Sequence, residues 1–146
     1  MLQKTYISVP CLIAKLIITH RNYTSFSRRL NVESMKQLAK QIKKMSCGNA
    51  LITFSLMAND AKNYENMHEA QLLAIAGCGE LSFDIVAFSC LSKLADTTDS
   101  HFDVEGNYAK WLQNVTEFAG SFFKRYPSVE ITPLFTYLCH MIRDEE

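Results

Sequence analysis

The chain has 146 residues, an apolar fraction of 48%, and 15 acidic and 15 basic residues. This length fits one domain, and the apolar content is high enough for a hydrophobic core, which argues against disorder over most of the chain. The zero net charge excludes a globally basic nucleic-acid-binding protein. The charge is nevertheless uneven, with seven basic residues and one acidic residue in 21–46, against two basic and nine acidic residues in 47–108.

Residues 1–25 form an N-terminal segment to which we assign no function. The apolar run at 6–19 contains Pro10 and Lys15 and is shorter than the ~20 residues that a membrane-spanning helix needs. Lys15 also interrupts the apolar core that a secretion signal requires. The pattern favours a short apolar helix or strand-like piece that packs on the following chain, with a targeting segment as the alternative.

Residues 26–146 have the pattern of consecutive helices, because apolar residues recur at spacings of three and four and no segment alternates like a strand. The predicted helices run from about 32 to 45, 50 to 61, 67 to 76, 83 to 95, 108 to 126, and from 132 onwards. Glycine or proline marks the breaks at 47–49, 77–79 and 126–127. We predict Asn31, Ser82 and Thr132 as N-caps, with Pro133 at the first helical position after the last of them.

The second and fourth predicted helices have apolar residues around more than one side, which indicates burial against several neighbours. Short breaks between successive helices favour antiparallel pairs. The fold class that we predict is all-α, with antiparallel helix pairs in a degenerate HEAT-like helical-repeat (solenoid) segment spanning 26–146. A compact helical bundle is the alternative fold.

The lysines of the first predicted helix are the candidate contact residues. They lie on one side of the helix, at Lys36, Lys40, Lys43 and Lys44. A phosphate backbone could bind there through charge and counterion release, so contact with RNA or a partner is the functional interpretation. A solvated helix face is the alternative, because no RNA-binding motif accompanies the lysines.

We predict no enzyme activity and no cofactor or metal site. Cys139 and His140 are adjacent, so on a helix they point about 100° apart and do not form a simple nucleophile–base pair. The four histidines lack metal-ligand spacing, and the five cysteines include no C-x-x-C pair, which fits free thiols in a reducing compartment. The glycosylation sequon at Asn114 lies inside a predicted helix, and we discount it.

Three stretches in chain order point to a family. WLQNVTEFAGSFFKRYPSVEITPLFTYL, at 111–138, combines spaced phenylalanines around a glycine, a basic pair, Tyr126-Pro127 and an apolar helix with Tyr137. SFDIVAFSCLSKLAD, at 82–96, precedes an acidic loop, and QIKKMSCGNALITFSLM, at 41–57, reads as helix, break and helix. Together they resemble the THO complex subunit 2 family. The resemblance covers about 27–142 and leaves out residues 1 to about 25.

The resemblance implies a segment from the middle of a large, non-enzymatic helical scaffold in the nucleus. The family's complex couples transcription to mRNA processing and export. The implied partners are other THO complex subunits, a DEAD-box RNA helicase and mRNA. The mRNA would be reached through the complex more than directly. The resemblance implies no contact with a membrane. Because the family's subunit is many times longer, we expect a fragment or a short divergent form.

Two other functions stay open from the sequence. One is a helical domain that binds RNA directly through the basic helix face. The other is a small secreted or organellar protein, which would use the N-terminal apolar run for targeting.

Overall fold

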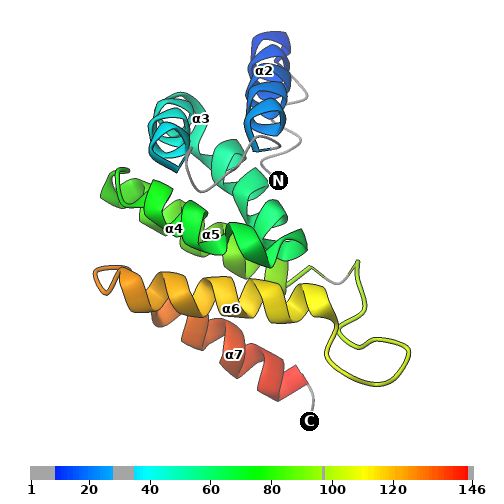
Figure 1. The fold of residues 1–146 in the computed structure, drawn as a ribbon. Coiled ribbons are helices and arrows are strands. Elements are labelled where there is room, and N and C mark those ends of the chain that lie inside the picture. The colour runs from blue at the N-terminus through cyan, green and yellow to red at the C-terminus, as the bar shows by residue number, and fades with distance from the viewer. Residues whose placement is uncertain (1–8, 28–34, 97, 145–146) are drawn as a thin grey trace.

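The computed structural model of the chain describes residues 9–27, 35–96 and 98–144. Its elements are α2 (Pro10–Ser27), α3 (Met35–Asn63), the short 3-10 helix η2 (Glu65–Met67), α4 (His68–Ile75), α5 (Glu80–Leu94), α6 (Lys110–Arg125) and α7 (Thr132–Asp144). Helix α2 and the first half of α3 lie at one end, α4 and α5 lie together in the middle, and α6 and α7 lie at the other end (Figure 1). The predicted all-α class is confirmed, and this layering is compatible with a helical-repeat segment.

Helix α2 shows that the N-terminal apolar run is helical from Pro10 onwards. Pro10 occupies the first helical position, where its missing N–H costs nothing, and the carbonyl of Val9 accepts hydrogen bonds from the Leu12 and Ile13 amides. The helix continues through Ser27 and contacts α3. Tyr23 is buried in that contact, so α2 packs on the following chain as expected.

Helix α3 contains the break that the sequence predicts at 47–49, but the break is a kink at one residue. Asn49 has non-helical backbone angles, φ −162° and ψ 79°, while the residues on both sides remain helical. Its side-chain Oδ1 accepts a hydrogen bond from the backbone N–H of Ile52 at 3.4 Å, which is the geometry of an N-cap for the second half of the helix. The predicted cap at Asn31 lies outside the described residues.

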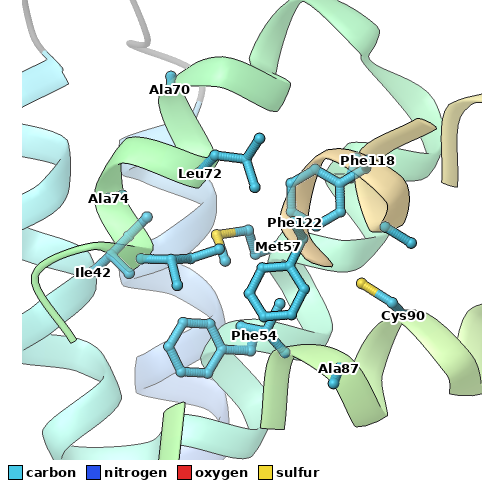
Figure 2. Packing of buried hydrophobic residues seen from close by; sticks show 14 of the residues in the cluster. Ile42, Phe54, Met57, Ala70, Leu72, Ala74, Ala87, Cys90, Phe118 and Phe122 are labelled. Atoms are coloured by element: carbon cyan, nitrogen blue, oxygen red, sulfur yellow. The ribbon is translucent and has the colours of Figure 1, made fainter. Parts of the chain in front are cut away.

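The core lies around the second half of α3. Helices α4, α5 and α6 all contact α3, and the central residues Phe54, Met57 and Ala61 are each about 1% exposed. Figure 2 shows Phe118 and Phe122 of α6 directed toward Met57 of α3. The predicted burial of this helical segment on several sides is therefore confirmed.

Two boundaries differ from the predicted caps. Helix α5 begins at Glu80 with Gly79 in the cap position, so Ser82 lies in the first turn and is not the cap. The amide of Ser82 donates to the carbonyl of Gly79, which continues the turn without a side-chain cap. Helix α7 begins at Thr132, but its first backbone bonds are accepted by the carbonyl of Ile131, one residue before the predicted cap.

The segment between α5 and α6 is the polar loop that the sequence predicts, and Trp111 anchors it. The indole Nε1 of Trp111 donates to the carbonyl of Ser100 at 2.9 Å, and the Lys62 ammonium lies 4.6 Å from the ring centroid. Lys62 also forms an ion pair with Asp99 of the loop. The apolar spacing of 108–126 predicts that Trp111 lies on the core stripe of α6, but the residue is only half-buried. It holds a loop against the helices instead.

Candidate functional site

All four lysines of the predicted contact face lie on the first half of α3, and all four are exposed. Lys36 and Lys40 lie one helical turn apart. Lys43 is directed toward the turn between α4 and α5, since its Cδ is 4.0 Å from the place that a Cβ on Gly77 would take. Lys44 lines a groove against α2. The structure therefore continues the lysine row into a groove that the sequence pattern did not reveal.

This groove lies between α2 and the first half of α3 and has a volume of about 440 Å³. We call it the α2–α3 groove. Lys15 and Asn22 line it from α2, and Gln41 and Lys44 line it from α3. The apolar side chains of Ile18, Phe26 and Met45 contribute to the same walls. Its lining therefore combines two cations, two amides and apolar surface.

The helices that form the groove carry an unopposed positive charge. The α2 helix and the first half of α3 contain six basic residues and no acidic residue. The ion pairs found among the described residues lie elsewhere, at Lys62–Asp99, Lys110–Glu65 and Arg125–Glu69. A second, smaller pocket of about 230 Å³ is lined by Glu80 and Asp84 and has the opposite character. The α2–α3 groove and the smaller pocket therefore differ in the charge of their lining residues.

A buried polar cluster fixes α2 beneath this surface. Tyr23 is 3% exposed and Gln71 of α4 is 1% exposed, and the pKa of Tyr23 is raised by burial and then by the neighbouring Asp60 carboxylate. Burial also raises the pKa of Asp60, while hydrogen bonds from Tyr23 and Ser27 lower it. The side-chain amide of Gln71 donates to the carbonyl of Met57 at 3.2 Å. Sequence reasoning missed this cluster because polar residues on three separate helices carry no periodic signal.

The residues considered for catalysis do not come together. Cys139 and His140 are both exposed on α7. His68 is buried, and its Nε2 lies 2.9 Å from the carbonyl of Ala61. Burial raises the pKa of the Cys90 thiol to about 12. Within the described parts of the chain, no three His, Cys, Asp or Glu side chains are grouped so that they could hold a metal ion.

The acceptor residue of the glycosylation sequon, Asn114, is buried. Asn114 is 3% exposed, and its side-chain amide donates to the carbonyl of Lys62 at 3.0 Å, which ties α6 to α3. The low weight given to this sequon is therefore confirmed.

Helix α7 carries a second uncovered surface, which is apolar. Its inner side contacts the end of α5, where the Tyr137 hydroxyl donates to the carbonyl of Leu94 at 2.9 Å. Its outer side exposes a stripe at helical spacing, which we call the α7 stripe. The stripe consists of Ile131, Phe135, Leu138 and Ile142, each between 45% and 65% exposed. The sequence predicts the apolar helix, but only the packing shows which side stays open.

Among the helices in the described ranges, none combines the length and the apolar character of a membrane span.

Comparison with known families matches residues 42–116 to Thoc2, the transcription- and export-related complex subunit. Among curated proteins, THO complex subunit 2 of Arabidopsis thaliana is 27% identical over 135 residues, which cover 92% of this chain and 7% of the relative. The human protein of the same name is 24% identical over 141 residues, covering 96% of this chain and 9% of the relative. The chain therefore spans less than a tenth of the length of these relatives.

These alignments extend the similarity beyond the range that the sequence patterns indicated. The first 25 residues are about a sixth of the chain, so an alignment that covers 96% of it includes most of them. Most of residues 1 to about 25 are therefore aligned with the relative, although the family model matches only 42–116. The motifs used for the resemblance all lie after residue 40, and weak similarity spread over a helix such as α2 leaves no motif to recognise.

Proposed function

We propose that this chain, which belongs to the family of transcription- and export-related complex subunits, is a non-catalytic scaffold segment of a THO complex. One observation carries the proposal: the family match, at 42–116, takes in most of the helices that build the buried core. It begins at Ile42 on α3 and ends at Thr116 on α6, next to the buried Phe118. The role of such a segment would be to hold a packed helical surface in place.

The α7 stripe supports a scaffold role. An exposed apolar stripe rimmed by polar residues marks a protein–protein contact more often than a free surface. The spacing from Ile131 to Ile142 matches the row that one helix offers to another. We assign this stripe to contact with an apolar helix of another THO complex subunit.

The finer functional statements follow from the relatives' name and belong to the proposal. The chain would act in the nucleus, in transcription-coupled mRNA processing and export. Its direct partners would be other THO complex subunits, and a DEAD-box RNA helicase would be recruited to the assembled complex.

Affinity purification from nuclear extract tests the proposal. A tagged copy of the chain, expressed in the cells that carry its gene, is expected to enrich named THO subunits over an untagged control. Quantitative mass spectrometry measures the enrichment. If no THO subunit is enriched although the tagged chain is soluble and folded, the scaffold proposal is wrong.

A pair of variants tests whether the α7 stripe makes the contact. Phe135→Ser/Leu138→Ser should lower the recovery of THO subunits severalfold, because hydrophobic anchors carry much of an interface's binding energy. Thr136→Ser/His140→Ser changes exposed residues on the polar side of the same helix and should leave recovery unchanged. The stripe variant should lose at most about 2 kcal/mol of stability, since its two apolar side chains are each about half exposed, and the control should stay within about 0.5 kcal/mol of the parent. Equal recovery with both variants would contradict the assignment.

A further inference from the structure

We propose that the α2–α3 groove binds the sugar-phosphate backbone of single-stranded RNA. The inference goes beyond the scaffold function, because it assigns the chain a direct ligand. It rests on the shape of the groove, on the charge of the two helices that form it and on the chemical mixture of its lining.

The groove supplies a place where cations from two helices meet. Lys15 of α2 and Lys44 of α3 line the same 440 Å³ space, although 28 positions separate them in the sequence. Lys40 and Lys36 continue the row away from it along α3. At a rise of 1.5 Å per residue, the row from Lys36 to Lys44 is about 12 Å long. This length gives an extended strand several phosphate contacts in sequence.

The charges in this region are free to act on a ligand. Lys15, Lys36, Lys40 and Lys44 are exposed and form no ion pair with another described residue. By contrast, Lys62, Lys110 and Arg125 in the other half of the molecule are each paired with a carboxylate. The first acidic residue of α3 is Asp60, which is half-buried beside Tyr23 and does not line the groove. The described residues that line the groove include no carboxylate, so they attract a polyanion.

The lining favours RNA over an acidic peptide. Asn22 and Gln41 are exposed amides, and their side chains make no hydrogen bond to another residue in the described ranges. Amides of this kind can bind base edges and the ribose 2′-hydroxyl. Phe26 and Met45 add apolar surface to the same walls, which suits the faces of unstacked bases. An acidic peptide would use the lysines and leave the remaining features without a role.

Binding of a labelled oligouridine to the full chain tests the inference, with fluorescence anisotropy measured over a range of salt concentrations. The parent protein should bind with a logarithmic salt slope of about −0.7 for each phosphate contacted. Lys15→Glu/Lys44→Glu should weaken binding on the order of tenfold or more at low salt. It should also reduce the slope by about 1.4, the value for two lost contacts.

Lys124→Glu/Arg143→Glu is the matched control, because it makes the same charge change at exposed positions on α6 and α7. This control should retain binding within about threefold of the parent, since non-local charge acts weakly at physiological salt. Circular dichroism checks that all variants keep the parent's helical content. If the groove variant and the control weaken binding equally, or if the parent protein binds no RNA, the inference fails.

Two further measurements distinguish RNA binding in the groove from RNA binding on the exposed lysine face and from binding of acidic protein segments. Lys36→Glu/Lys40→Glu/Lys43→Glu removes the exposed row but leaves Lys15 and Lys44 in place. If this variant loses RNA while the groove variant binds like the parent, RNA binding belongs to the exposed face and the groove assignment is wrong. Polyglutamate of matched charge should compete poorly with the RNA. Equal competition would identify the groove as a site for acidic protein segments and overturn the inference as well.

None of these outcomes depends on assembly into a THO complex. A groove variant that loses RNA but still enriches THO subunits would support both proposals. A groove variant that binds RNA like the parent would contradict the groove alone. The failure of one proposal is therefore distinguishable from the failure of the other.

Discussion

Phe118→Ala tests the packing of α6 on α3 most sharply. The Phe118 side chain is 1% exposed, belongs to the buried core cluster and lies 5.4 Å from the ring of His68, centroid to centroid. Burying a phenylalanine side chain contributes roughly 1.5–3 kcal/mol through transfer from water alone. Truncation to alanine also leaves a cavity, and measured costs for buried phenylalanines are about 3–5 kcal/mol. We expect the free energy of unfolding to fall by about 3–5 kcal/mol.

Urea unfolding followed by circular dichroism measures this loss. Phe88→Ala is the matched control, because Phe88 lies on α5 and is 54% exposed. Its truncation should cost less than about 1 kcal/mol, since about half of the ring is already in contact with water. The dependence on urea should keep the same slope in both variants, so that a shift of the midpoint reports stability. If the Phe118 variant loses less than about 1 kcal/mol, or no more than the Phe88 variant, this description of the core is wrong.

Three more substitutions test other parts of the structure. The change in the free energy of unfolding caused by Asp60→Asn should be more favourable at neutral pH than at low pH. Burial raises the pKa of Asp60, so the stability that its protonated form provides is present at low pH and is lost as the pH rises through the folded-state pKa. Urea unfolding of the parent and the variant at about pH 4 and about pH 7 measures this change, and an equal change at both pH values would contradict the prediction. Asn49→Ala should cost about 0.5–2 kcal/mol through loss of the cap at the kink, and a gain in stability would show that Asn49 is not a cap. Trp111→Phe removes the hydrogen bond to Ser100, so it should cost about 0.5–1.5 kcal/mol and speed hydrogen exchange in 98–109, whereas unchanged exchange would show that the indole does not anchor the loop.

The sequence pattern predicted the helices well because their apolar spacing is local. The stop at Tyr126-Pro127 matches the end of α6 at Arg125, and the turn at Gly77-Cys78-Gly79 separates α4 from α5. Those signals depend on the backbone limits of proline and glycine, which act within one or two residues. The kink at Asn49 was harder to predict, since one residue that caps a new helix can interrupt α3 without a loop.

The functional surfaces were less predictable because they depend on contacts between distant residues. Lys36 to Lys44 form a row on any helical wheel, so the sequence pattern predicts a basic helix face there. Lys15 lies in a run that read as apolar, and only the packing of α2 on α3 brings it to the same groove. The role of Trp111 was misjudged for a similar reason. An aromatic residue at a core position of the helical pattern can pack on a neighbouring loop, and the pattern does not distinguish the two.

Exchanging segments between homologues tests whether this chain is a scaffold segment of a THO complex. The matching segment of human THO complex subunit 2, which is 24% identical to this chain, would be replaced by this chain within the full-length human protein. Recovery of the other THO subunits with the chimera would then be compared with recovery after deletion of the segment and after insertion of an unrelated helical domain of equal length. We expect the chimera to recover the complex well above both controls. A stable chimera that recovers no more of the complex than the deletion would contradict the claim that this chain is a scaffold segment of a THO complex.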